Sequence, residues 1–476
     1  MSDAAASDPV TPETVSHDIP MAEHLRQAIA ADWDPAPPMP HPAHGDGAPS
    51  AAWHRKALSG EFPGKLIVVP AGAMKVRAND TDYAFRAASS FTWLTGETVA
   101  DAVLVMAPDG DTHEATLYIG VYAQPGEPKY FTSRTHGAVW VGNAPSVEDT
   151  EAALGIRTRP LRDLDRDLAA QRADRADEAD LARVLDELRL VKDEWEIGRL
   201  RYACAATARG FADVVRELPN VIGRDDICGE RWLEGTFWRR ARLDGNDVGY
   251  TSIVGSGRHA TTLHWWRNHG VVEPGTLLLA DMGVETDELY TADVTRTMPV
   301  SGEWTPEQLR VYRAVQEAQA AGVAEVKAGA DFLAAHRAAM WVLADHLHSW
   351  GILPVPAEVS CDPDEERPGA GLHRRYTLHG TSHMLGIDVH DCAQARSELY
   401  RDGTLVAGHC LTVEPGLYFQ VNDRTVPAEL RGIGVRIEDD VVVTDGEAIN
   451  LSAALPRDPD EITAWMREVQ STPTRP

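Results

Sequence analysis

The chain has 476 residues, 43% of them apolar and 25% charged, an ordinary globular mixture with room for two or three domains. Its formal net charge of −28 argues against nucleic acid and anionic membranes as partners, because both bind basic surfaces. The five irregularly spaced cysteines indicate reduced thiols of a cytoplasmic protein, and we recognise neither a signal peptide nor an apolar run long enough to span a membrane.

Residues 1–48 are rich in Ala, Asp and Pro, with a short helical pattern at 21–31. They predict an extended arm; the alternative is a strap that packs on the body of the protein or on a second subunit. From residue 49 helical segments alternate with apolar runs such as KLIVVPAG and DAVLVMAP. This alternation predicts an N-terminal α/β domain over residues 49–188, which ends in a charged and strongly helical stretch.

Residues 189–476 form the second predicted domain. Apolar residues at helical spacing predict helices over 190–218 and 227–243, followed by a strand and a glycine-rich turn, GSG. This turn lacks the lysine of a phosphate-binding loop, so we interpret it as a simple turn before His264. Further along, the pattern predicts a helical stretch from 306 to 350, a surface loop over 354–371 and a final helix.

The segment 277–300, LLLADMGVETDELYTADVTRTMPV, reads as a β-hairpin that carries Asp281 and Asp293 among apolar residues. Burying an unpaired carboxylate costs several kcal/mol, so inward carboxylates are usually paired or bound to metal. The ordinary alternative is that one or both of them lie at turns in solvent.

Three histidines, His379, His383 and His390, follow in YTLHGTSHMLGIDVHDC. Glu414 lies in the apolar strand pattern GHCLTVEPGLYF, and RGIGVRIEDDVVVT contains the remaining two candidates, Arg436 and Glu438, which strand alternation puts on one face. Two Asp, two Glu and one His form a set of hard oxygen donors and one imidazole, which suits a pair of Mn²⁺, Co²⁺ or Zn²⁺ ions. No cysteine belongs to the set, which disfavours a structural zinc site.

These residues resemble a known family. Five motifs of this chain resemble, in order and wording, the metal-ligand motifs of the pita-bread metallopeptidases. Among these the chain looks most like the Xaa-Pro aminopeptidases (aminopeptidase P). The five residues are Asp281 in DMG, Asp293 in TADVTRTMPV, His383 in HGTSHMLGIDVHD, Glu414 in LTVEPGLY and Glu438 in GVRIEDD. The resemblance covers residues 190–445 and extends faintly to RANDTDYAFRAASSFTWLTG in the first domain. It implies an N-terminal α/β domain followed by a C-terminal pita-bread domain of the creatinase/aminopeptidase type.

The resemblance also implies an activity. A hydroxide that bridges two divalent metal ions, Mn²⁺ with Co²⁺ or Zn²⁺ as alternatives, would attack the bond between an N-terminal residue and a following proline. Glu414 would orient this nucleophile and transfer its proton. His264 would lie near the scissile bond or the product amine, His390 would donate to the carbonyl oxygen, His379 would contact substrate, and Arg436 would hold a ligand carboxylate. A homodimer or homotetramer is expected on the same ground.

Proline specificity requires a hydrophobic wall for the ring. The aromatic candidates near the histidines, each with core packing as its ordinary alternative, are Trp265, Trp266, Tyr376 and Tyr418. A prolidase that cuts Xaa-Pro dipeptides is the first competing interpretation, since Arg396 or Arg401 could hold a substrate carboxylate. A non-catalytic pita-bread binding module and a creatinase are disfavoured, because those relatives lack the metal ligands.

Overall fold

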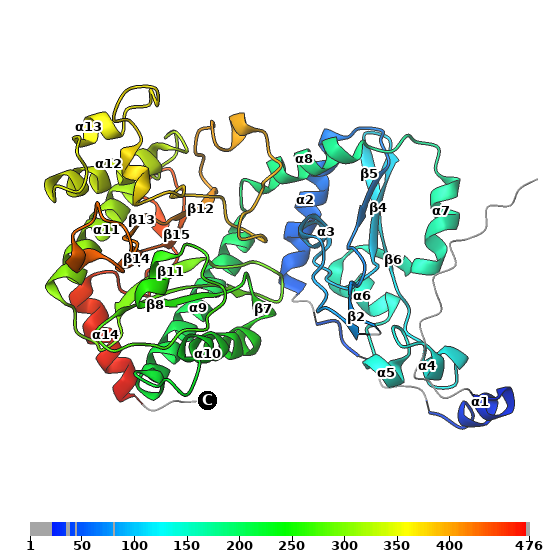
Figure 1. Ribbon diagram of the computed structural model, residues 1–476. Helices are drawn as coiled ribbons and strands as arrows, with labels where there is room; N and C mark the ends of the chain where they lie inside the picture. The colour runs from blue at the N-terminus through cyan, green and yellow to red at the C-terminus, as the bar shows by residue number, and fades with distance from the viewer. Residues whose placement is uncertain (1–20, 35–38, 43–44, 80, 473–476) are drawn as a thin grey trace, which may run out of the picture. The chain divides into compact units, whose positions relative to one another are not determined.

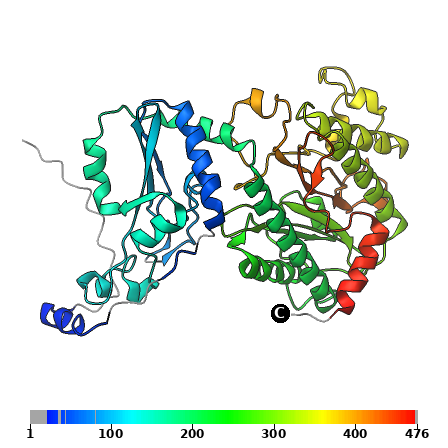
Figure 2. The same cartoon turned by 180° about the vertical axis from the view of Figure 1, so that it is seen from behind.

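The computed structural model describes residues 21–34, 39–42, 45–79 and 81–472 and divides into two compact units, Met1–Glu178 and Ala179–Pro476 (Figures 1 and 2). Most of the predicted N-terminal arm, namely residues 1–20, 35–38 and 43–44, lies outside the described residues. Within its described part, the helical pattern at 21–31 corresponds to α1 (Glu23–Ile29).

The first unit contains a four-stranded sheet in the order β1-β4-β5-β6. In this sheet β4 is antiparallel to both of its neighbours, β1 and β5, and β6 is parallel to β5. Its remaining helices and strands are α2 (Ala48–Glu61), β1 (Ile67–Pro70), β2 (Val76–Ala78), β3 (Thr81–Asp82), α3 (Ser89–Thr95), β4 (Val103–Asp109), β5 (Thr112–Ile119), α4 (Pro128–Thr132), α5 (Ala138–Val141), α6 (Val147–Leu154), β6 (Arg157–Pro160) and α7 (Leu164–Ala170). His54 joins α2 to α3, because its ring stacks on Trp93 at 3.9 Å and its Nδ1 lies 2.8 Å from the Trp93 carbonyl oxygen.

The described residues of the second unit form four small sheets, with strand orders β11-β9-β8, β10-β7, β12-β15-β16 and β13-β14. Its helices and strands are α8 (Glu178–Arg189), which begins at the boundary, α9 (Glu194–Val221), α10 (Gly229–Asp244), β7 (Asp247–Val248), β8 (Ile253–Ser256), β9 (Leu277–Met282), β10 (Val284–Glu285), β11 (Val294–Pro299), α11 (Pro306–Ala324), α12 (Ala334–Ser349), α13 (Ala357–Ser360), β12 (Cys410–Val413), β13 (Gly416–Tyr418), β14 (Gly434–Arg436), β15 (Asp439–Val442), β16 (Ile449–Asn450) and α14 (Pro459–Ser471). Within this unit the strands gather in the middle, with α9 and α10 on one side and α11 and α12 on another (Figures 1 and 2).

The strands β9 and β11 are buried along their whole length, on both faces. Their side chains join one large apolar core with α9, α10, α11 and α12. Because both faces are covered, the strands read in the sequence as nearly continuous apolar runs. Any polar side chain on them is therefore withdrawn from water and needs a partner.

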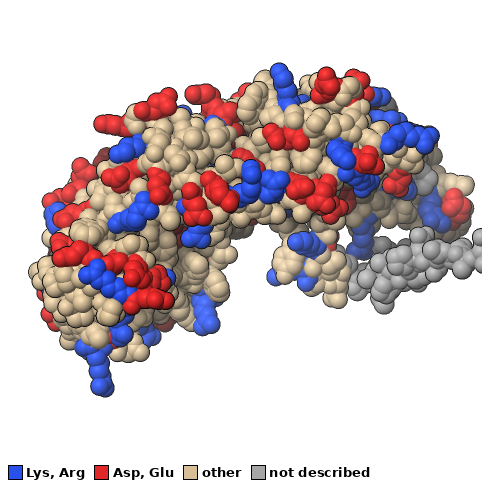
Figure 3. Space-filling model, turned by 90° about the horizontal axis from the view of Figure 1, so that it is seen from above, with Lys and Arg blue, Asp and Glu red and all other residues tan. Residues whose placement is uncertain are grey.

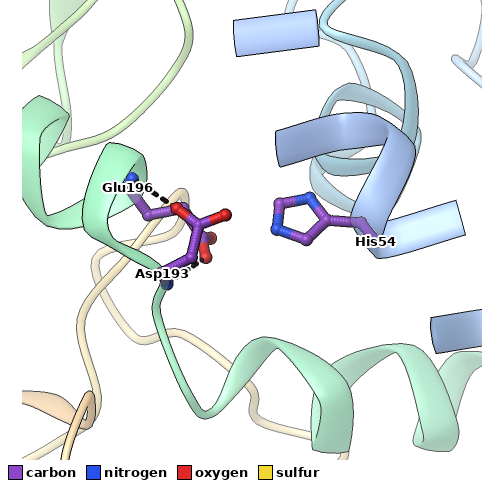
Figure 4. Close-up of side chains that lie close together, drawn as sticks. All are labelled: His54, Asp193 and Glu196. Carbon is purple, nitrogen blue, oxygen red and sulfur yellow. Dashed lines mark hydrogen bonds between the residues drawn. The ribbon is translucent and has the colours of Figure 1, made fainter. Parts of the chain in front are cut away.

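The long helices begin at side-chain caps that the sequence provides. Asp193 accepts a hydrogen bond from the Glu196 amide at the start of α9, and Glu196 accepts one from the Asp193 amide in return (Figure 4). Thr305 and Gln308 form the same reciprocal box at α11, where Pro306 occupies the first turn. Each box satisfies two amides that the helix itself leaves without acceptors.

Two predicted helical stretches are interrupted. The stretch 306–350 divides into α11 and α12, because Gly329 adopts a left-handed φ of 86° and backbone bonds at Ala328 and Phe332 join the intervening segment to other loops. The charged stretch after residue 161 breaks between α7 and α8, where the Ala176 amide donates to the Leu66 carbonyl. Backbone pairing with a distant segment, which local periodicity does not encode, causes both interruptions.

Acidic and basic side chains are interspersed on the face drawn in Figure 3. None of the described helices combines the length and the apolar character that a membrane crossing requires. All five cysteines are free thiols, as expected for a chain without a disulfide framework.

Candidate metal centre

One cavity of about 690 Å³ in the second unit brings the predicted site residues together. All nine of them line it: His264, Asp281, Asp293, His379, His383, His390, Glu414, Arg436 and Glu438. These residues come from segments spread over more than 170 positions of the sequence. The predicted metal ligands and the predicted substrate-contacting histidines therefore face a common space.

The hairpin predicted at 277–300 is present and aligns the two aspartates. Asp281 on β9 lies opposite Thr295 on β11 in an antiparallel register, and Asp293 precedes Thr295 by two residues. Since side chains two residues apart on an extended chain point to the same face, Asp281 and Asp293 share the face that borders the cavity.

The two glutamates come from a second pair of strands. Val413, the last residue of β12, pairs with Asp439, the first residue of β15. Glu414 follows the first of these strands and Glu438 precedes the second, so the same register places both carboxylates at one end of the pair. The predicted single strand through Arg436 and Glu438 is divided into β14 and β15 at this point. Arg436 and Glu438 nevertheless contact the same hydroxyl, that of Thr295.

Three of the donors already lie close enough to share an ion. One ligand atom each from Asp293, His383 and Glu438 lies within 4.8 Å of the other two. The His383 Nδ1–H donates to the Met384 carbonyl at 3.1 Å, which leaves Nε2 directed at Asp293 Oδ2, 3.3 Å away, and at Glu414 Oε1, 3.4 Å away. A ring held in this way directs Nε2 at the carboxylates, and a metal ion would replace the proton that Nε2 donates to Asp293.

Electrostatics favours a cation at this point. Burial raises the pKa of Glu438 well above its usual value, and repulsion from Asp293 and Glu414 adds to the shift. Burial also raises the pKa of Glu414, to about 7, although His383 opposes the shift. Burial alone would lower the pKa of His383, but its hydrogen bond to Asp293 and the charge of Glu414 raise that pKa to about 9. Crowded, buried carboxylates of this kind are stabilised by a divalent ion, so the residues fit such a metal.

Asp281 is held by two donors. Tyr250 Oη donates to its Oδ1 at 2.6 Å, and Arg436 Nη2 donates to its Oδ2 at 2.5 Å. Arg436 is buried and donates further to Thr295 Oγ1 and to the Tyr418 hydroxyl. Arg436 therefore contacts Asp281, one of the predicted metal ligands.

The three other histidines differ in exposure and in hydrogen bonding. His264 and His390 are exposed to the cavity, and the His390 ring packs edge-on against His383 at 4.4 Å. His379 is more confined: its Nδ1 donates to the Gly380 carbonyl and its Nε2 lies 2.8 Å from the Tyr418 hydroxyl. Burial lowers the pKa of His379 to about 4, so this ring is neutral at physiological pH.

Of the four aromatic residues considered for the wall around a proline ring, only Trp266 lines the cavity. Trp265 donates its indole N–H to Glu230, Tyr376 lies in the main core, and Tyr418 packs beneath His379. Arg401 lines the cavity, whereas Arg396 is paired with Glu187 at 2.6 Å outside it. The core-packing alternative thus applies to three aromatic candidates, and one of the two arginines is left for the prolidase hypothesis.

Sequence reasoning missed several residues of the centre. Tyr250 and Thr295 donate to the predicted ligands Asp281 and Glu438, and Asp440 accepts the Asp293 backbone amide at 3.0 Å. Tyr250 occurs in a short polar stretch, GYTS, without a pattern of its own. Thr295 could have been recognised as a partner of the ligands, because it is one of several polar residues inside the apolar hairpin pattern.

Comparison with known proteins supports these observations. Residues 198–445 match the model of metallopeptidase family M24, and residues 51–178 match the model of the aminopeptidase P N-terminal domain. The chain is 50% identical over 439 residues to a protein named Xaa-Pro aminopeptidase 2 from Streptomyces coelicolor, an alignment that covers 88% of this chain and 91% of the relative.

Two solved structures extend the similarity. Aminopeptidase P from Escherichia coli with the inhibitor Pro-Leu superposes with a TM-score of 0.77 at 27% identity, covering 89% of this chain and 99% of that one. The zinc-substituted E. coli enzyme in complex with product gives a TM-score of 0.77 at 27% identity with the same coverage, 89% and 99%. Both units of this chain thus have counterparts in a single known architecture.

Proposed function

The chain belongs to metallopeptidase family M24, and we propose that it is a metal-dependent aminopeptidase that releases the N-terminal residue from peptides with proline at the second position. The predicted family and fold are confirmed: an aminopeptidase P N-terminal domain precedes a pita-bread domain. One structural observation supports the activity above all, namely the convergence of five metal-ligand candidates and three further histidines on one cavity.

We assign the metal to Asp281, Asp293, His383, Glu414 and Glu438. Two divalent ions fit four carboxylates and one imidazole, and Mn²⁺ is our first choice among ions that hard oxygen donors accept, with Co²⁺ and Zn²⁺ as alternatives. When bound, such ions lower the pKa of water and polarise a carbonyl group. Arg436 and Tyr250 keep the Asp281 carboxylate oriented toward this task.

Three side chains carry proton transfer and charge stabilisation in the proposed reaction. Glu414 accepts a proton from the attacking water and returns it to the proline nitrogen, which loses its bond to the carbonyl carbon. Its raised pKa suits such exchange, and a bound cation would lower that pKa again because it favours the carboxylate. His390 and His264 face the cavity as donors for the carbonyl oxygen and the product.

We attribute the proline requirement to the lining of the cavity. A tertiary amide offers no N–H, so the substrate is selected by shape rather than by a hydrogen bond at that nitrogen. Trp266, with the newly recognised lining residues Ile253, Leu263 and Tyr250, supplies apolar surface of a suitable kind. We propose these four residues in place of the three aromatic candidates that pack elsewhere.

The decisive experiment is hydrolysis of an Xaa-Pro-Yaa peptide by metal-stripped protein, restored in turn by Mn²⁺, Co²⁺ and Zn²⁺. We expect activity only with metal, and its loss in Asp293→Ala and Glu414→Ala proteins that keep the wild-type circular dichroism spectrum. Full activity in either variant would refute the site assignment. Metal analysis after dialysis should give about two ions per chain, whereas a non-catalytic binding module would hold none.

A prolidase remains the second candidate, because Arg401 lines the cavity and no described residue engages its guanidinium in a hydrogen bond or an ion pair. Comparing Xaa-Pro with Xaa-Pro-Yaa as substrates separates the two activities. The predicted cytoplasmic location and the homodimer or homotetramer stay part of our proposal, the first supported by the five free thiols and the second by family membership alone.

A further inference from the structure

Glu230, in the first turn of α10, is a completely buried carboxylate outside the cavity. Within the described part of the chain its one ion-pair partner is His259, at 2.8 Å, and neither lysine nor arginine reaches it. A buried carboxylate of this kind must be stabilised by hydrogen-bond donors, because it can only accept. The positions of these donors in the chain therefore indicate the role of Glu230.

Four donors surround the Glu230 carboxylate, two at each oxygen. Oε1 accepts from the Ser256 amide and from His259 Nδ1, both at 2.8 Å. Oε2 accepts from the Trp265 indole N–H at 2.8 Å and from the Gly270 amide at 2.6 Å. All four donors belong to the segment 256–270. The Glu230 side chain therefore binds both ends of this segment and two residues between them.

The segment begins with β8's last residue, continues through a 3₁₀ helix (Gly257–Thr261), and contains His264 and Trp266. Glu230 fixes Trp265, the residue between these two, and both neighbours of Trp265 line the cavity. Gly270 has to be glycine, because a Cβ there would lie 2.7 Å from the Glu230 carboxyl carbon. The close approach of Glu230 is thus built into the backbone of the segment.

We propose that Glu230 is a positioning residue that sets the geometry of His264 and Trp266, an inference that rests on the proposed function for its kinetic consequence. Glu230 does not line the cavity, so it acts through the segment 256–270. Four charge-assisted hydrogen bonds hold the segment more firmly than neutral ones would. Pre-organisation of this kind matters because displacing a catalytic group by about 1 Å can cost about 10²-fold in rate.

Hydrogen–deuterium exchange tests the structural half without relying on activity. Glu230→Gln keeps the size of the side chain, but its amide nitrogen would face two N–H donors that it cannot accept. We expect faster exchange over residues 256–270 in this variant. The matched control is Asp213→Asn, a buried carboxylate on α9 that binds Arg216 and Arg240 instead. Exchange in the segment that is unchanged by Glu230→Gln, or equally raised by Asp213→Asn, would overturn the proposal.

A double-mutant cycle tests the kinetic half on an Xaa-Pro-Yaa peptide with metal-loaded protein. Glu230→Gln should lower kcat about 10- to 100-fold with little change in KM, and the same change made in His264→Ala should lower kcat no further. Equal effects in both backgrounds would show that Glu230 does not act through His264. If Glu230→Gln does not fold, Trp265→Phe removes one of the four donors and should give a smaller effect of the same kind. Wild-type protein without activity would refute the proposed function, while the exchange experiment would still decide the role of Glu230.

Discussion

The guanidinium of Arg436 lies 2.5 Å from the carboxylate of Asp281, and both side chains are buried. Arg436 is therefore a fixed positive charge among four carboxylates of the centre. In the absence of metal it is the nearest compensation that Asp281 has, and burial of the carboxylate raises its pKa although Arg436 opposes this. Arg436 and a bound metal ion would thus both compensate the negative charge of Asp281.

We predict that Arg436→Met destabilises the metal-free protein by about 3–5 kcal/mol, because it leaves the buried Asp281 carboxylate without the guanidinium paired with it. Metal-loaded protein should lose less, so Mn²⁺ should raise the melting temperature of this variant more than that of wild type. Thermal melts with EDTA and with Mn²⁺ measure both effects. Arg337→Met, at an exposed pair with Asp331, is the control, and equal metal-induced shifts in Arg436→Met and wild type would contradict the prediction.

Tyr250→Phe should weaken metal binding about 10- to 100-fold while the fold stays intact, because it removes the hydroxyl that donates to Asp281 Oδ1. Calorimetric titration of the metal-stripped protein with Mn²⁺ measures the change in Kd. The exposed Tyr202→Phe on α9 controls for loss of a phenol as such. Unaltered affinity in Tyr250→Phe would mean that Asp281 needs no orientation from this side.

Site residues could be predicted from the sequence where the reason for their presence lies in the neighbouring residues. The Asp281 and Asp293 hairpin was predictable because carboxylates inside an apolar strand pattern need a cation. Tyr250 was not predictable, because its role depends on β8 and β9 lying side by side, a contact between segments with no shared pattern. Arg396 was a reasonable carboxylate ligand by position, but Glu187, more than 200 residues earlier, pairs with it. Long-range contacts of this kind decide which of several similar side chains faces the cavity.

Arg296 on β11 should be critical for stability. This buried side chain donates to Asp439 at 2.7 Å and to the carbonyl oxygens of Glu438 and Leu455 at 2.7 and 3.0 Å. Arg296→Met removes this donor from Asp439 Oδ1 and from both carbonyl oxygens and should cost about 3–5 kcal/mol. Urea unfolding followed by intrinsic fluorescence measures the loss. Arg313→Met, at an exposed pair, should cost less than about 1 kcal/mol, and a similar value for both variants would contradict the prediction.

The stability of the second unit should depend on acid through Asp391. Burial would raise the pKa of Asp391, but Arg189 and Lys192 outweigh it and lower that pKa to about 2. Since the folded pKa lies below the unfolded one, the stabilisation is complete above about pH 4 and disappears as the pH falls toward 2. It amounts to about 2 kcal/mol at neutral pH.

Lys192→Met tests this dependence, because it removes one of the two cations at Asp391. The stability difference between wild type and this variant should be largest above about pH 4 and should shrink as the pH falls toward 2. Urea midpoints measured from pH 6 to pH 2 follow it. Lys327→Met, at an exposed pair with Glu325, should show a small difference at every pH. A constant gap for Lys192→Met would exclude Asp391 as the titrating group.

His390→Ala separates metal binding from catalysis. The His390 ring faces the cavity and touches His383 edge-on, but it is not among the three close donors of the centre. We therefore expect unchanged metal content and a kcat lower by about 10²–10³-fold, the usual cost of removing a donor to a developing oxyanion. Elemental analysis and peptide hydrolysis are measured on the same preparation, with His346→Ala, a half-buried histidine of α12 outside the cavity, as the control. Loss of metal together with activity would instead show that His390 is a metal ligand and not only a hydrogen-bond donor to the substrate.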